Sequence, residues 1–85
     1  MDQVIQVRLE NKPGALMRVA GILTATGSNI QSLILKPDAL EEGISNMTIV
    51  ADIEPRLRER VVQQMNRLVN VFSASDVTNA AQQQS

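Results

Sequence analysis

The chain has 85 residues, enough for one small domain, with a formal net charge of −1, one Phe and no Trp, Tyr, Cys or His. The scarcity of aromatic residues and the lack of a basic stripe argue against nucleic-acid binding. Without Cys or His, thiol nucleophiles, Ser-His-Asp triads, zinc sites and redox pairs are excluded, and no arrangement of carboxylates suggests a site for another metal.

Nothing in the sequence indicates a membrane or export segment. No apolar run approaches the roughly 20 residues that a membrane-spanning helix needs. Asp2 and Gln3 open the chain, where a leader would place positive charge followed by an apolar run. We therefore expect a cytoplasmic protein with no membrane partner. A domain of this size gains stability by forming oligomers.

The first half of the chain predicts a strand, a helix and a second strand. Residues 4–9 alternate apolar and polar side chains, as in a half-buried strand. Asn11-Lys12-Pro13-Gly14 has the composition of a turn, and the apolar spacing after it predicts a helix over about 14–26, ended by Gly27. The branched residues of 30–35 predict the second strand.

The second half predicts a hairpin, a helix and a last strand. A loop over 37–44 leads into a strand over 47–51, which is expected to pair with the second strand. Glu54-Pro55 opens the second helix, because Pro suits the first helical position. Residues 70–77 predict a short fourth strand, and 78–85 a disordered tail. The buried stripe of the second helix is expected to consist of Leu57, Val61, Met65 and Leu68.

This order of elements predicts an α+β fold, the ferredoxin-like βαββαβ sandwich. A single domain over 1–77 would hold a four-stranded antiparallel sheet with both helices on one face. The other face, with residues such as Gln6 and Arg8, would be either hydrated or used by a partner. Because this fold hosts many functions, the function has to be inferred from the site residues.

The first turn and the following helix have the features of a site for a small zwitterion. A helix N-terminus presents unpaired N–H groups and partial positive charge, and Gly14 would let a carboxylate approach the backbone. Asn11 and Asn29 offer amide oxygens to an ammonium group, while Leu16 and Ile30 can hold an aliphatic side chain. Each residue also has a structural reading, since Asn and Gly suit turns and Leu and Ile suit a core.

Other chemistries find less support in the same loop. A metal chaperone would need paired cysteines there, and a phosphatase would need an anion-binding arginine, whereas the loop offers only Lys12. No general base tuned near neutrality is visible, which argues against an enzyme. Recognition of a small aliphatic amino acid by a non-catalytic module is the interpretation that remains.

Five segments of the chain resemble the ACT domain, and specifically the small regulatory subunits of acetolactate synthase (acetohydroxyacid synthase). The resemblance runs over about residues 3–77. The first loop together with Asn29-Ile30 is the general ACT signature. The segments are Leu-Glu-Asn-Lys-Pro-Gly-Ala-Leu at 9–16, Arg18-Val19 with Gly21 in the helix, Gly-Ser-Asn-Ile-Gln-Ser-Leu at 27–33, Ser-Asn-Met-Thr-Ile at 45–49 and Leu-Val-Asn-Val at 68–71.

The resemblance implies a regulatory role in branched-chain amino acid biosynthesis. In this family two ACT domains pair side by side, and valine binds between them as a feedback inhibitor. It implies a homodimer, a catalytic partner subunit that uses thiamine diphosphate, Mg and FAD, and no cofactor on this chain. By position, the first loop of one chain would face Asn29 and Ile30 of the other. The ligand-binding residues of that loop would be Asn11, Pro13, Gly14, Ala15, Leu16 and Met17.

Two alternatives fit the same residues. The chain could be a stand-alone ACT module that senses another small amino acid, such as serine or glycine, for a different enzyme. It could also be a dimerisation module without a ligand, in which an edge strand alone pairs two chains. At two positions the chain departs from residues common in the family, with Met17 in place of a serine and Ser28 in place of an aromatic residue.

Overall fold

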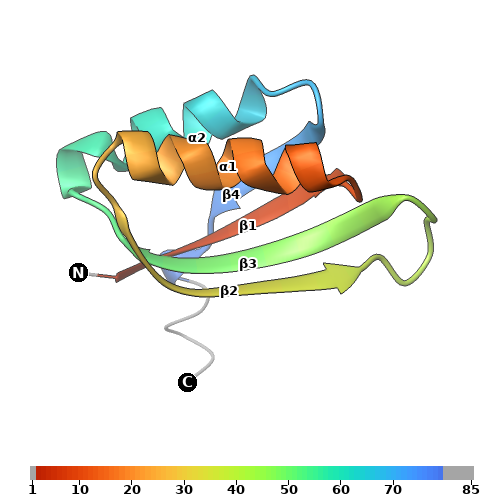
Figure 1. Cartoon of the computed structure of the whole chain (residues 1–85). Coiled ribbons are helices and arrows are strands. Elements are labelled where there is room, and N and C mark those ends of the chain that lie inside the picture. The colour runs from red at the N-terminus through yellow and green to blue at the C-terminus, as the bar shows by residue number, and fades with distance from the viewer. Residues whose placement is uncertain (1, 80–85) are drawn as a thin grey trace.

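The computed structural model describes residues 2–79, and its elements follow the predicted order. Both helices lie on the same side of the sheet (Figure 1), which confirms the expected two-layer arrangement. The strands are β1 (Asp2–Glu10), β2 (Asn29–Pro37), β3 (Ile44–Asp52) and β4 (Val71–Asp76), and the α-helices are α1 (Pro13–Ala25) and α2 (Arg58–Asn66).

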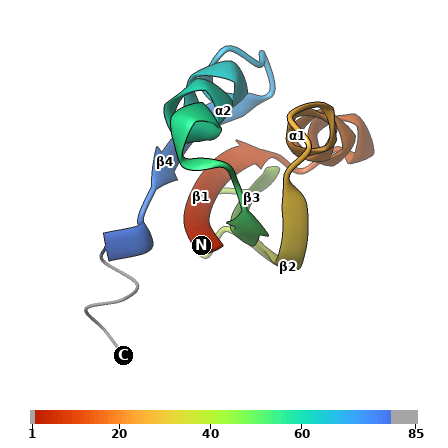
Figure 2. The ribbon, with the colours of Figure 1, turned by 90° about the vertical axis from the view of Figure 1, so that its left-hand side faces the viewer.

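The sheet has the strand order β2-β3-β1-β4, and all three pairings are antiparallel. The two central strands are therefore β3 and β1, while β2 and β4 form the opposite edges. Seen end-on (Figure 2), α1 lies over the β2 side of the sheet and α2 over the β4 side. Each edge strand is thus accompanied by its own helix.

The core lies between the helices and the inner face of the sheet. On β1 the predicted alternation holds, because Ile5, Val7 and Leu9 are buried while Gln6 between them is exposed. The helices contribute residues at helical spacing, so that one stripe of each faces the sheet. The buried helical residues are Ala15, Val19 and Leu23 of α1 and Val61 and Met65 of α2.

Two elements begin three residues away from their predicted starts. The chain after Glu54 first forms a 3-10 turn, Pro55–Leu57, in which the Leu57 N–H donates to the Glu54 carbonyl at 2.8 Å. The α-helix therefore starts at Arg58 and not at Pro55. β3 begins at Ile44, three residues before the predicted start at Met47, because its first residues already pair with the end of β1.

The chain after β4 stays attached to β1 as far as it is described. The Val77 N–H donates to the Val4 carbonyl at 2.8 Å, and the Val4 N–H donates to Thr78 Oγ1 at 3.0 Å. Ordered contacts therefore reach one residue beyond the predicted end of the domain at Val77. The rest of the predicted tail, 80–85, lies outside the described residues. Neither α1 nor α2 is long and apolar enough to span a membrane, and residues 2–79 hold no other candidate.

Candidate functional site

A pocket of about 240 Å³ lies where β1 passes into α1. Its walls come from the end of β1, the first turn of α1, and the facing ends of β2 and β3. Three of the predicted site residues, Asn11, Pro13 and Leu16, line it together. Its other lining residues are Leu9, Glu10, Lys12, Leu35 and Ser45.

The N-terminus of α1 is left without a side-chain cap. Lys12 occupies the N-cap position in an extended conformation, its side chain makes no capping hydrogen bond, and the first turn holds no acidic residue. The N–H groups of Ala15 and Leu16 both turn back to the Lys12 carbonyl, at 3.0 and 3.4 Å. The partial positive charge of the helix end is therefore not offset by a carboxylate of the helix itself, which favours an anionic ligand at this point.

The residues of the first turn differ in what they can offer a ligand. Gly14 is exposed, and a Cβ placed on it would meet no atom within 4 Å, so the backbone is open to approach. Leu16 is half-buried, packing on the core while also lining the pocket. Ala15, by contrast, is 1% exposed and belongs to the core, so only its backbone can take part in a site. Met17 is 73% exposed to solvent and does not line the pocket.

Asn29 and Ile30 lie at the other end of α1. They pair with Asp52 and Ala51 at the end of β3, whereas the pocket contains Ser45 at its beginning. The 13 residues of α1 separate the two groups by roughly 20 Å along the helix axis. One chain therefore does not bring the predicted site residues together. A second copy running antiparallel along β2 would place its Asn29 end beside this pocket.

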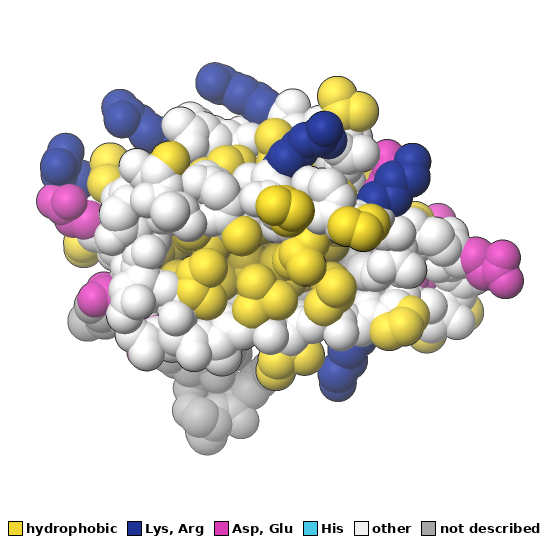
Figure 3. All heavy atoms as spheres, viewed as in Figure 1, with side chains coloured by type: hydrophobic (Ala, Val, Ile, Leu, Met, Phe, Trp, Pro, Cys, Tyr) yellow, Lys and Arg dark blue, Asp and Glu magenta, His cyan; other side chains and the backbone are white. Residues whose placement is uncertain are grey.

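An apolar surface connects the two groups. Leu33 and Leu35 of β2 pair with buried residues of β3, so they lie on the helix side of the sheet. Figure 3 shows apolar side chains gathered between α1 and β2 along this edge. We call this surface the α1–β2 apolar face and define it by Leu16, Met17, Ile30, Leu33 and Leu35.

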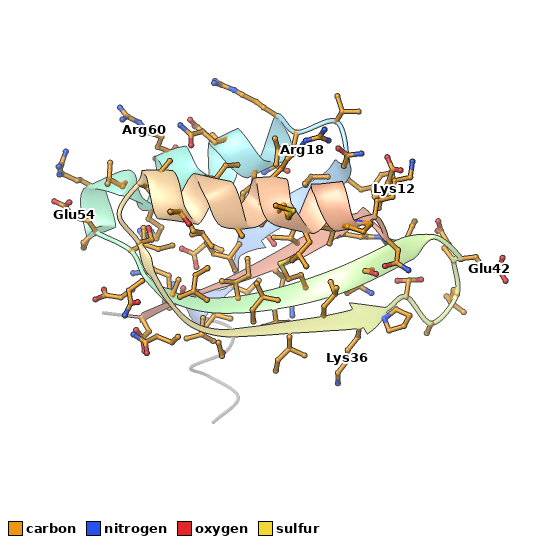
Figure 4. All side chains as sticks on the ribbon, viewed as in Figure 1. Lys12, Arg18, Lys36, Glu42, Glu54 and Arg60 are labelled. Carbon is orange, nitrogen blue, oxygen red and sulfur yellow. The ribbon has the colours of Figure 1, made fainter. Side chains whose placement is uncertain are left out.

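A polar network that the sequence does not predict connects the first loop to α1 and to the segment before β4. Lys12 Nζ lies 3.1 Å from Glu10 Oε2, and Asn70 Nδ2 donates to Glu10 Oε1 at 3.2 Å. The hydrogen bond from Lys12, followed by that from Asn70, lowers the pKa of Glu10 below its ordinary value. Arg18 donates in turn to Asn70 Oδ1. In Figure 4 Arg18 projects from the N-terminal half of α1 and Lys12 from the loop before the helix.

The loop is held on its other side by the β2–β3 hairpin. The Asn11 N–H donates to the Gly43 carbonyl at 2.8 Å. Within the hairpin, Asp38 accepts from Asn46 Nδ2 at 2.9 Å and from the N–H groups of Leu40 and Glu41 at 3.0 Å. These bonds, led by that from Asn46, lower the pKa of Asp38 to about 2. The turn of the hairpin is thus hydrogen-bonded internally and to the first loop, and the two strands that it joins contribute Leu35 and Ser45 to the pocket.

A larger hollow, of about 470 Å³, lies between α2 and the end of β4. Its charged groups include Arg58 and Asp76, which form an ion pair with each other at 3.3 Å. The N-terminus of α2 beside it also lacks a side-chain cap, but its first turn carries Glu59, whose carboxylate offsets the positive charge of the helix end. None of the predicted site residues lines this hollow. We therefore take the smaller pocket at the start of α1 as the candidate site.

Comparison with known families and sequences gives a consistent result. The family model described as AHAS small subunit-like ACT domain matches residues 5–73. The probable acetolactate synthase small subunit of Archaeoglobus fulgidus is 37% identical over 81 residues, covering 95% of this chain and 50% of that protein. The isozyme 3 small subunit of Escherichia coli is 35% identical over 81 residues, with 95% and 49% covered. The chain thus spans about half the length of these relatives.

Solved structures share the fold. The acetolactate synthase small subunit from Thermotoga maritima superposes with a TM-score of 0.75 at 24% identity, covering 89% of this chain and 47% of that chain. The ACT domain from GTP pyrophosphokinase of Chlorobium tepidum gives 0.73 at 16% identity, covering 89% and 96%. At these identities the likeness shows the fold alone.

Proposed function

The chain belongs to the AHAS small subunit-like ACT domains, and from this membership we propose that it is a non-catalytic regulatory domain of acetolactate synthase. In this proposal it forms a homodimer and binds a branched-chain amino acid, with valine the first candidate, between the two copies. Binding provides feedback control of branched-chain amino acid synthesis. Thiamine diphosphate, Mg and FAD belong to the catalytic subunit and not to this chain.

The observation that carries the proposal is the uncapped N-terminus of α1 opening on a small pocket with apolar walls. A carboxylate near Gly14 would meet the N–H group of Gly14 and the positive end of the helix dipole, while the Ala15 and Leu16 N–H groups bond to the Lys12 carbonyl. Leu16 and Leu35 would contact an aliphatic side chain. Together these features suit a small ligand with one anionic end and one apolar end.

The second copy supplies what one chain lacks. The ammonium group of the ligand needs an acceptor, and the amide oxygens of Asn11 and of Asn29 of the partner subunit would provide it. The α1–β2 apolar face is the surface that would be buried between the copies, since β2 is an edge strand with free backbone groups. The ligand therefore stabilises the pair as well as each chain.

Regulation follows if the catalytic subunit prefers one arrangement of the dimer and the ligand prefers another. The ligand can shift the equilibrium only by its difference in affinity for the two arrangements, which for such systems is about 1–3 kcal/mol. The first loop could transmit ligand binding to the rest of the domain, because it is hydrogen-bonded to two other segments. These are the β2–β3 hairpin and the loop that contains Asn70.

Thermal melting with a panel of amino acids tests the proposal. A ligand at about 100 times its dissociation constant stabilises by roughly 2.7 kcal/mol, which for a domain of this size raises the melting midpoint by about 10–20 °C. We expect this rise with valine, leucine or isoleucine and none with D-valine. A rise with serine or glycine alone would contradict the branched-chain assignment, and no rise with any amino acid would contradict ligand binding altogether.

A further inference from the structure

The only aromatic residue of the chain is on the surface. Phe72 lies on β4 and is 57% exposed, and Val69, in the preceding loop, is 91% exposed. A domain with a single aromatic side chain would be expected to bury it, because aromatic rings contribute most to core energetics. We call these two residues the Val69–Phe72 patch.

The backbone directs Phe72 outward by a β-bulge. Along β1, Arg8 pairs with Ser73 and Leu9 pairs with Val71, so Phe72 has no counterpart on β1. A bulge of this kind inserts one extra residue in a strand and can re-aim its side chain, and bulges are over-represented at sheet edges and next to active sites. The register in which β4 pairs with β1 therefore determines that the Phe72 ring is exposed.

The patch is joined directly to the first loop of the proposed ligand site. The Glu10 N–H donates to the Asn70 carbonyl at 2.8 Å, and the Asn70 side chain donates back to Glu10 at 3.2 Å. Arg18 of α1 donates to the same side chain. Asn70 thus lies between Val69 and Phe72 in sequence, while its carbonyl and its side-chain amide bond to Glu10 and Arg18 beside the pocket.

The charge around the patch indicates what kind of surface it would meet. Arg18 donates to Asn70 within the patch segment, and Arg67 precedes that segment in the chain. Both arginines are exposed, and within residues 2–79 neither forms an ion pair with a carboxylate. A symmetric contact between two copies of this patch would set these arginines against the same arginines of the other copy. The patch therefore suits a different protein, with an apolar pocket for the ring and carboxylates around it.

We propose that the Val69–Phe72 patch docks on the catalytic subunit, and that Asn70 is the positioning residue that links this contact to the first loop; the proposal rests on the proposed function. β4 and β2 are the opposite edges of the sheet (Figures 1 and 2), so a dimer formed through β2 leaves both patches accessible. Aromatic residues at the centre of an interface commonly carry most of its affinity.

Direct binding to the acetolactate synthase catalytic subunit of the same organism tests the docking surface. We expect Phe72→Ser and Val69→Ser each to weaken binding about 10-fold or more. Leu40→Ser is the matched control, because Leu40 is 93% exposed at the tip of the β2–β3 hairpin, away from the patch. It should change affinity less than about twofold. Val69→Ser guards against a folding defect of Phe72→Ser, since Val69 is nearly fully exposed.

The outcomes separate the two proposals. Equal binding by the wild type and both patch variants would overturn the docking surface while leaving the proposed function intact. Failure of the wild type to bind the catalytic subunit, with the amino acid response in melting retained, would overturn the regulatory role and the docking surface together. An equal loss with Leu40→Ser would show that the patch is not specific, and would also overturn it.

The link through Asn70 has its own test. Asn70→Ala removes the side-chain bonds to Glu10 and Arg18 but leaves both patch residues. We expect its affinity for the catalytic subunit to stay within about threefold of the wild type, while the effect of valine on that affinity falls substantially. A merely structural role would lower the melting midpoint without changing the response to valine, and that result would overturn the link.

Discussion

Gly14 is the residue on which the proposed ligand site depends most directly. It is exposed in the first turn of α1, and the space around its Cα is open. The side chains of its neighbours in the turn are already packed, since Ala15 lies in the core and Leu16 contacts both the core and the pocket. A change at Gly14 therefore alters the approach to the helix end without disturbing the packing beneath it.

Gly14→Asp should abolish the amino acid response. The added carboxylate would occupy the helix end and repel the carboxylate of the ligand, while its position in the first turn would favour the helix itself. We expect the melting midpoint without ligand to be unchanged or slightly raised, and the rise with valine to vanish. Gly14→Ala is the control for bulk alone and should retain part of the rise. A full valine response in Gly14→Asp would place the ligand elsewhere.

Asp38 predicts a pH dependence of stability. Its pKa is lowered to about 2 in the folded chain from 3.8, so the folded state favours the ionised form. The stabilisation is fully present above the unfolded pKa and is lost as pH falls toward about 2. Asp38→Asn should melt below the wild type by a constant interval above pH about 5, and the interval should shrink between pH about 4 and 2. An interval independent of pH over that range would show that the charge of Asp38 is not the cause.

Residue patterns anticipated part of the site. Asn11 and Leu16 are expected from turn chemistry and helical spacing, and Pro13 from the family resemblance. The structure brings the three to one pocket. The contribution of Asn70 was not foreseen, because Glu10 and Asn70 are 60 positions apart and meet only through the pairing of β4 with β1. Ala15 is also expected in the site from the family resemblance, and because its side chain is buried in the core, its backbone is the part that can contribute.

At the scale of elements, α1 combines three tasks. One stripe packs on the sheet, its N-terminus faces the pocket, and Met17 on its outer side belongs to the α1–β2 apolar face. Gly21 lies on the exposed side of the same helix, where a Cβ would contact no atom within 4 Å. A glycine inside a helix weakens it, because its backbone loses more freedom on folding.

Gly21→Ala should stabilise the chain by about 0.5–1 kcal/mol, which corresponds to a rise of roughly 2–8 °C in the melting midpoint. The open surroundings of the residue mean that no clash opposes the gain in helix propensity. Differential scanning calorimetry of the two proteins at equal concentration measures the difference. A lower midpoint would indicate that another backbone approaches this point of the helix.

The elements were predicted well where local pattern alone decides them. The alternation in β1 and the spacing in α1 are local, and both were found at nearly the expected bounds. The 3-10 turn at Pro55–Leu57 and the bulge at Phe72 were not predicted. The first depends on a hydrogen-bond register one residue shorter than that of an α-helix, and the second on the register against β1, which sequence spacing does not reveal.

At the scale of the whole molecule, the two edges of the sheet differ in the apolar surface that they expose. The β2 edge carries the continuous α1–β2 apolar face, while the β4 edge carries the isolated Val69–Phe72 patch. The larger surface fits a permanent self-association, and the smaller one fits a contact with a different protein. The order of the strands was predictable from the order of elements, whereas this division of surfaces required the structure.

Met17→Lys should dissociate the proposed dimer without unfolding the chain. Met17 is 73% exposed in the single chain, so a lysine there costs little in the monomer. In the dimer it would place a charge in an apolar contact, and we expect the dimer dissociation constant to rise about 10-fold or more. Sedimentation equilibrium over a concentration series measures it, with Leu40→Lys at the hairpin tip as the control. An unchanged constant for Met17→Lys would exclude this face from the dimer.

The exposure of Phe72 has a practical consequence for watching the protein at work. With no Trp or Tyr anywhere in the sequence, the chain has almost no intrinsic fluorescence when excited near 295 nm. A tryptophan substituted at Phe72 would be the only fluorophore, placed at the outer edge of the sheet and partly in water. Its emission would move to shorter wavelength as the ring leaves water for a binding pocket, so the same residue that is proposed to dock would report the moment of docking.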